Sequence, residues 1–194
     1  MVTFQPYDHL GFEVKGFGEN FLLSLGYDVL CFKTIVNDWY QNISLQEMKN
    51  KVSQFTKHYS SRVGYGSSMG AYAILYFSET LDLQRIIAIS PQFSIDRNIV
   101  PFELRWGETT SISFSHAQMS GCGVEVTLIY DPFDKLDKRH VSLIRQCFLK
   151  GQDIALPFTG HPSVSALSEC NLLRYTIESL LCERDVDFRK IQKP

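Results

Sequence analysis

The sequence lacks the features of a membrane or secreted protein. None of its apolar runs approaches the ~20 residues that a membrane-spanning helix needs. Residues 1–6, MVTFQP, carry neither the positive charge nor the apolar stretch of a secretion signal. We therefore expect a cytoplasmic protein without a membrane partner.

An excess of positive charge is absent as well. The chain has 19 Lys and Arg residues against 21 Asp and Glu residues, and its formal net charge is −2. Proteins that bind nucleic acid draw much of their affinity from cations that neutralise phosphates. Nucleic acid is therefore not an expected partner.

Paired cysteines and metal-ligand spacings are missing too. The five cysteines are scattered without a C-x-x-C pair, and no grouping of His, Cys and carboxylates has the spacing of a metal site. We expect reduced thiols in the core and no metal. Gly16-Phe17-Gly18 lacks the spacing and the Lys of a phosphate-binding loop, so we interpret it as the start of a helix.

The chain does contain a regular alternation of two patterns. Short apolar runs rich in β-branched residues alternate with longer helical patterns, which is typical of an α/β protein. We expect a single domain over residues 1–194, with strands at 2–4, 27–32, 62–65, 85–90, 124–130 and 153–157. The prediction is a three-layer α/β fold: a mostly parallel six-stranded sheet in the order 2-1-3-4-5-6, with helices on both faces.

Two helices are predicted from local signals. The tetrapeptide SLQE at 44–47 matches an S-x-x-E capping box, so a helix should begin there and bury Met48, Val52 and Phe55. A final helix is expected over about 163–181.

The pattern G-x-S-x-G occurs at residues 66–70, GSSMG. It follows a strand pattern and precedes a helical segment rich in small residues, which is the setting of a nucleophile elbow. In such an elbow the serine sits in a strained turn, and the two glycines make room for neighbouring backbone. We predict that Ser68 is a nucleophile and that Ser67 has no chemical role.

A serine hydroxyl needs a base to take its proton. Carboxylates and a histidine follow Ser68 in that order: the fifth predicted strand ends in YDPFD at 130–134, and His161 follows the sixth. The carboxyl ends of parallel strands meet at one edge of a sheet, so these side chains can meet Ser68 there.

The motifs GYGSSMG, YDPFD and TGHPS resemble those of the α/β-hydrolase superfamily, and the resemblance spans essentially the whole chain. It implies that Ser68 is the nucleophile, His161 the general base, and Asp134 the acid that orients the imidazole. Asp131 is the alternative acid. Members of the superfamily commonly place this acid a few residues beyond the strand, which favours Asp134.

The resemblance also implies an oxyanion hole built from two backbone N–H groups. Met69, directly after the nucleophile, should supply one. The other should come from the loop after the first strand, where residues 4–7, FQPY, replace the usual His-Gly. Pro6 has no N–H, so Gln5 is the first candidate and Tyr7 the second.

Substrate contacts are expected from other residues at the same edge of the sheet. Trp39 and Tyr40 lie in a polar loop after the second strand, where core packing is the alternative, and Gln92 follows the fourth. Arg105 is interpreted either as an anchor for an anionic substrate group or as packing. It lies in residues 92–118, which we expect to cover the site.

These residues predict a serine hydrolase that cleaves a carboxylic ester or related small acyl substrate through an acyl-enzyme, without a cofactor. Two alternatives stay open. An alcohol, sugar or amine could intercept the same acyl-enzyme, which would make the protein an acyltransferase. The chain could also be a catalytically inactive binding protein of this fold, although the intact set of Ser, Asp and His argues against that.

Overall fold

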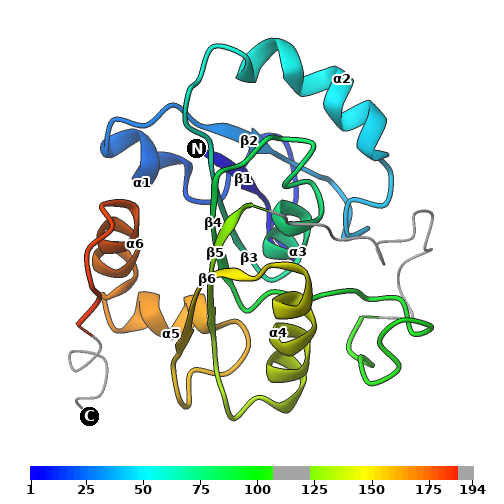
Figure 1. Ribbon diagram of the computed structural model, residues 1–194, viewed down its shortest axis with the longest axis vertical. Coiled ribbons are helices and arrows are strands. Elements are labelled where there is room, and N and C mark those ends of the chain that lie inside the picture. The colour runs from blue at the N-terminus through cyan, green and yellow to red at the C-terminus, as the bar shows by residue number, and fades with distance from the viewer. Residues whose placement is uncertain (107–122, 188–194) are drawn as a thin grey trace.

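Within residues 1–106 and 123–187, which the computed structural model describes, six parallel strands form a central sheet (Figure 1). The strands are β1 (Val2–Phe4), β2 (Leu30–Phe32), β3 (Val63–Ser67), β4 (Arg85–Ile89), β5 (Glu125–Tyr130) and β6 (Lys150–Ala155). Their order is β2-β1-β3-β4-β5-β6, and every neighbouring pair is parallel. The predicted fold class and strand order are confirmed.

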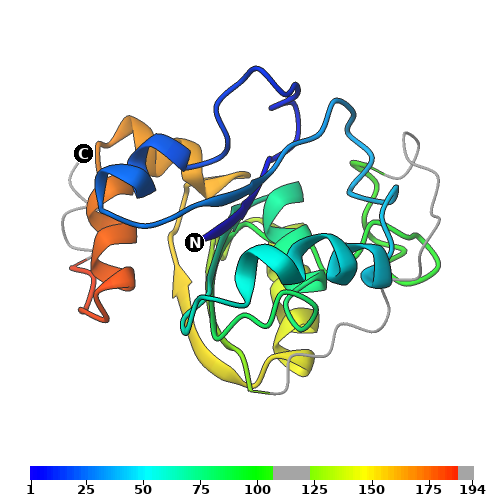
Figure 2. The same ribbon diagram turned by 90° about the horizontal axis from the view of Figure 1, so that it is seen from above.

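Helices cover both faces of this sheet (Figure 1, Figure 2). On one face lie α1 (Glu19–Ser24), α5 (Ser163–Glu169) and α6 (Leu173–Leu181), and on the other lie α2 (Leu45–Thr56), α3 (Met69–Tyr76) and α4 (Lys135–Cys147). Each face has its own apolar core, one around Phe4, Ile74 and Ile144 and one around Leu22 and Ile177. The sheet is therefore buried on both sides, as parallel sheets generally are.

The predicted capping box starts α2. The Glu47 N–H donates to Ser44 Oγ at 3.2 Å, and the Ser44 N–H donates to the Glu47 carboxylate at 2.8 Å. Met48 and Val52 are buried as expected, but Phe55 is 58% exposed. Phe55 departs from the prediction because the last turn of α2 borders an open hollow beside β2 instead of the packed core.

The last predicted helix is two helices. Asn171, between α5 and α6, takes a left-handed φ of 56°, a conformation that ends a helix. Cys170 and Cys182 follow the ends of these helices and are exposed, so not every thiol lies in the core as expected. No helix in the described part of the chain is both long and apolar enough to cross a membrane.

The strand order fixes where a site can form. The chain turns from β1 outward to β2 and then crosses back to β3 on the other side of β1. Ligands of open α/β sheets bind at such a switch point, outside the carboxyl ends of the strands. Ser68, which follows β3, lies at this edge.

Candidate active site

Ser68 sits in a strained turn between β3 and α3. Its backbone angles, φ 49° and ψ −122°, belong to a region that residues with a Cβ rarely occupy. Two glycines allow the turn: a Cβ on Gly66 would come within 2.7 Å of the Gly70 carbonyl, and one on Gly70 would overlap the Phe4 carbonyl oxygen. The G-x-S-x-G pattern thus reflects close packing of β3, α3 and β1 around the serine.

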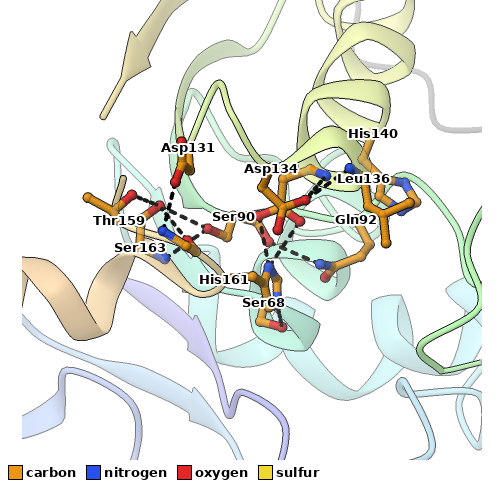
Figure 3. Close-up of polar contacts among 12 residues, drawn as sticks. Ser68, Ser90, Gln92, Asp131, Asp134, Leu136, His140, Thr159, His161 and Ser163 are labelled. Atoms are coloured by element: carbon orange, nitrogen blue, oxygen red, sulfur yellow. Dashed lines mark hydrogen bonds and ion pairs between the residues drawn. The ribbon is translucent and has the colours of Figure 1, made fainter. Parts of the chain in front are cut away.

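The structure brings Ser68 and His161 together. Ser68 Oγ lies 3.0 Å from His161 Nε2, across 93 residues of sequence (Figure 3). His161 follows β6 in a loop that is fixed by several hydrogen bonds. The Asp131 carboxylate accepts from the Gly160 N–H at 2.8 Å, and Ser90 Oγ accepts from the Ser163 N–H at 3.0 Å. The backbone is therefore anchored both before and after His161.

The carboxylate that contacts His161 belongs to Asp137. His161 Nδ1 lies 2.8 Å from Asp137 Oδ2 and 3.0 Å from Oδ1, and the Asp137 side chain is fully buried. Because Asp137 accepts from Nδ1–H, the Nε2 atom is left as the acceptor for the Ser68 hydroxyl. Asp137 thereby occupies the position that the sequence predicted for Asp134.

Asp134 is corrected as the expected partner of His161. Its Oδ1 accepts from the N–H groups of Leu136 and Asp137, both at 2.9 Å, and so it caps the start of α4 (Figure 3). Asp131, the alternative acid, is also used elsewhere, because its carboxylate accepts from the Phe133 and Gly160 N–H groups. The signal for Asp137 was present in the sequence as a third aspartate, one helical turn after Asp134.

Asp137 stays ionised despite its burial. Burial alone would raise the pKa of Asp137, but the hydrogen bond from His161 and the charge of Arg105 outweigh this effect and lower the pKa below its usual value. The Arg105 guanidinium donates to Asp137 Oδ1 at 3.2 Å from both Nη1 and Nη2. Arg105 therefore binds a carboxylate of the protein itself. This geometry does not favour the predicted role as an anchor for an anionic substrate group.

The candidate oxyanion donors differ in availability. Met69 is the first residue of α3, where N–H groups have no acceptor within the helix. The Gln5 N–H, by contrast, donates to the Phe32 carbonyl at 3.1 Å and extends the pairing of β1 with β2. Gln5 is therefore corrected as the expected second donor. Among the described residues the N–H of Tyr7, the other candidate, has no acceptor.

Trp39 belongs to an aromatic cluster that reaches the site. Its ring lies 5.3 Å from Tyr72, 5.7 Å from Trp106 and 6.3 Å from Tyr7, and Trp106 lies 6.0 Å from His161. Trp39 is fully buried, and its Nε1–H has no acceptor among the described residues. The cluster thus places the Trp106 ring beside the imidazole of His161.

Tyr40 and Gln92 take different positions. The Tyr40 hydroxyl donates to the Gln5 carbonyl at 3.0 Å, so Tyr40 supports the loop after β1 and is not free to contact substrate. Gln92 is fully buried and donates from Nε2 to the Ser90 carbonyl at 3.3 Å, while its Oε1 has no partner among the described residues. The predicted cover, 92–118, lies outside the described residues from position 107 on.

This arrangement is suited to moving one proton. The Ser68 hydroxyl can pass its proton to His161 Nε2, and the resulting imidazolium is stabilised by Asp137. Within residues 1–106 and 123–187, no group of three or more His, Cys, Asp or Glu side chains is arranged to hold a metal ion.

Comparison with known proteins shows a likeness of fold. No family model and no curated protein matches the sequence. Among solved structures, the capsule O-acetyltransferase of Neisseria meningitidis serogroup A superposes with a TM-score of 0.61 and 13% identity, over 93% of this chain and 85% of that chain. Its complex with caged gadolinium gives a TM-score of 0.61 and 12% identity over the same shares. The chain thus shares its parallel α/β fold with an acetyltransferase.

Proposed function

We propose that the protein is a serine-dependent acyltransferase of the α/β-hydrolase superfamily, which forms an acyl-enzyme on Ser68 and passes the acyl group to a hydroxyl acceptor. The observation that carries the proposal is the continuous chain from Ser68 Oγ through His161 to Asp137, at 3.0 Å and 2.8 Å. Its position on a strained turn at the carboxyl edge of the sheet adds support.

The first half of the reaction acylates Ser68. As Oγ attacks the carbonyl carbon of the donor, its proton moves to His161 Nε2, and a tetrahedral intermediate forms. The N–H groups of Met69 and Tyr7 stabilise the oxyanion. The bond to the leaving group then breaks, and the leaving group takes the proton from His161.

The second half repeats these steps with an acceptor. A hydroxyl gives its proton to His161 and attacks the acyl carbon, and the new ester leaves as Ser68 regains its proton. The reaction consumes one acyl donor and one alcohol and needs no cofactor. The partners are therefore small acyl-bearing and hydroxyl-bearing molecules.

Two observations favour transfer over hydrolysis. The protein with the shared fold is an O-acetyltransferase. In addition, Ser68 is only 4% exposed, and Trp106 of the aromatic cluster lies 6.0 Å from the His161 ring, which limits the access of water to the acyl-enzyme. Hydrolysis is the second candidate, because the same acyl-enzyme is released whenever His161 activates a water molecule instead.

The surroundings of Ser68 favour a short acyl group. Met69 and Tyr72 follow Ser68 on α3 with fully buried side chains, and the buried Trp39 ring lies 5.3 Å from that of Tyr72. These large side chains are already packed against one another, so a long acyl chain would have to displace them. An acetyl group is the size that we propose.

The test follows both products from one donor. p-Nitrophenyl acetate is incubated with the protein, with and without a panel of alcohols and sugars, and acetate and new esters are quantified separately. We expect p-nitrophenol release that Ser68→Ala abolishes, together with an acetyl ester of at least one acceptor. If acetate is the sole product with every acceptor, the protein is a hydrolase and the proposed acyl transfer is wrong. Release that persists in Ser68→Ala would contradict both.

A further inference from the structure

The Arg105 guanidinium joins two buried carboxylates. Besides its contacts to Asp137, it donates to Glu103 from Nε at 3.1 Å and 3.2 Å and from Nη2 at 2.7 Å. The side chains of Glu103 and Asp137 are fully buried, whereas that of Arg105 is 23% exposed. A flat guanidinium is the side chain best suited to bridge two carboxylates in this way.

The chain of contacts continues to His140. His140 Nδ1 accepts from the Phe93 N–H at 3.1 Å, so the ring proton of the neutral imidazole is on Nε2, which lies 2.9 Å from Glu103 Oε2. Burial opposes ionisation of Glu103, but the hydrogen bonds from His140 and Arg105 outweigh it and lower the pKa of Glu103 to about 2. Glu103 is therefore an anion throughout the working pH range.

The charges along this chain alternate. Behind His161 stand the Asp137 anion, the Arg105 cation and the Glu103 anion, a net charge of −1. Arg105 also occupies Asp137 Oδ1, which leaves Oδ2 to make the shorter contact with His161. Both the orientation and the effective charge of Asp137 thus depend on Arg105.

We infer that Arg105, held by Glu103, is a positioning residue that sets the pH range in which His161 can accept the proton of Ser68. The inference rests on the proposed function for the part that concerns reaction rates. It does not assign any contact between Arg105 and substrate.

The physical reason is the sign of each neighbouring charge. A cation beside Asp137 disfavours a second cation on His161, and the Glu103 anion offsets part of that effect. Other groups near His161 are Asp131 and Asp134 from the loop after β5 and the neutral His140 from α4. Replacing Arg105 or Glu103 leaves the backbone hydrogen bonds to Asp131 and Asp134 in place, and the Phe93 N–H still donates to His140 Nδ1, so these three groups keep their charge states.

Replacing Arg105 and replacing Glu103 should therefore have opposite effects on the protonation of His161. Arg105→Met leaves two anions behind His161, since His140 still donates to Glu103, and protonation of His161 becomes easier. Glu103→Gln keeps the size and the acceptor oxygen of the side chain but leaves the Arg105 charge without its counter-ion, and protonation of His161 becomes harder. A role in packing alone would not give shifts of opposite sign.

The first experiment measures the acylation rate with p-nitrophenyl acetate as a function of pH. Relative to wild type, we expect the midpoint of the acid limb to rise by about one pH unit in Arg105→Met and to fall by about one pH unit in Glu103→Gln. Arg174→Met, on the opposite face of the sheet with a side chain 61% exposed, should keep the wild-type midpoint. Shifts of the same sign, or no shift, would overturn the inference.

A second experiment needs no catalysis. The His161 ring is titrated by NMR in a Ser68→Ala background, with and without the Arg105 and Glu103 substitutions, and the same opposite shifts are expected. Arg105→Lys keeps the positive charge but loses the planar guanidinium that bridges the two carboxylates. It should keep the wild-type midpoint and show a lower acylation rate. If Arg105→Met does not fold, Glu103→Gln and Arg105→Lys still decide the question. A wild type without acylation would instead refute the proposed function, while the NMR titration would still test the role of Arg105.

Discussion

Asp134 holds the backbone of Asp137, and Asp137 holds His161. The Asp137 N–H donates to Asp134 Oδ1 at 2.9 Å, and the Asp137 carboxylate lies 2.8 Å from His161 Nδ1. The helix cap and the histidine contact are therefore formed by two aspartates, one directly before α4 and one in its first turn. Fixing the start of the helix also fixes the direction from which the carboxylate meets the imidazole.

This division of tasks gives different expectations for the two aspartates. Asp137→Asn should lower kcat/KM for p-nitrophenyl acetate by about 10³–10⁴-fold, because a neutral amide no longer stabilises the imidazolium. Asp134→Asn should change it little, because Asn caps helices as well as Asp does. Comparable losses in both variants would contradict the assignment of Asp137.

The two glycines of the turn should be needed for stability. Gly66→Ala and Gly70→Ala each place a Cβ against backbone that cannot move aside, so each should lower the free energy of unfolding by about 1–3 kcal/mol or more. Urea denaturation measures this. Gly26→Ala is the comparison: its φ is 84°, but no described residue lies within 4 Å of an added Cβ, so only backbone strain of about 1 kcal/mol is expected.

The low pKa of Glu103 predicts a loss of stability in acid. Its pKa is about 2 in the folded protein and 4.5 when unperturbed, so the folded state favours the anion. The stabilisation by ionised Glu103 is complete above the unfolded pKa and is lost as pH falls through the folded pKa. It amounts to at most about 3.5 kcal/mol. The free energy of unfolding is measured at about four pH values between about 6 and about 2. As the pH decreases, it should fall more steeply in wild type than in Glu103→Gln.

A surface carboxylate provides the control for that measurement. Glu169→Gln, at the exposed end of α5, should keep the wild-type pH dependence. The same slope in wild type and Glu103→Gln would show that the contacts of Glu103 with Arg105 and His140 do not stabilise its ionised form.

Trp106 should limit hydrolysis of the acyl-enzyme. Its ring lies 6.0 Å from that of His161, and its removal opens the pair to water. In Trp106→Ala we expect the ratio of acetate to acetyl ester to rise several-fold, measured by the product analysis proposed above. Phe55→Ala, on the exposed side of α2, should leave the ratio unchanged. An unchanged ratio in Trp106→Ala would show that this aromatic cluster does not determine the balance between transfer and hydrolysis.

Much of the architecture could be predicted because its signals are local. Alternating strand and helix patterns predict a parallel α/β sheet, and the capping box at Ser44 predicts the start of α2 to the residue. The proximity of Ser68 to His161 followed from the rule that loops after parallel strands share an edge. These inferences need no knowledge of how side chains pack.

The corrected predictions depended on contacts that local patterns do not specify. The sequence prediction chose between Asp134 and Asp131 and did not consider Asp137, because only the path of α4 shows which aspartate points to His161. Gln5 was excluded by a hydrogen bond to Phe32, which depends on the register of β1 against β2. Arg105 could not be placed because its partners, Glu103 and Asp137, lie on two segments that meet only in the folded chain.

A fluorophosphonate probe reacts with activated serines, so labelling shows whether Ser68 is a nucleophile. We expect the wild type and Ser67→Ala to be labelled, since Ser67 Oγ is buried and has no hydrogen-bond partner within residues 1–106 and 123–187. Labelling should be lost in Ser68→Ala and in His161→Ala. A folded wild type that stays unlabelled, or labelling that survives in Ser68→Ala, would contradict the account.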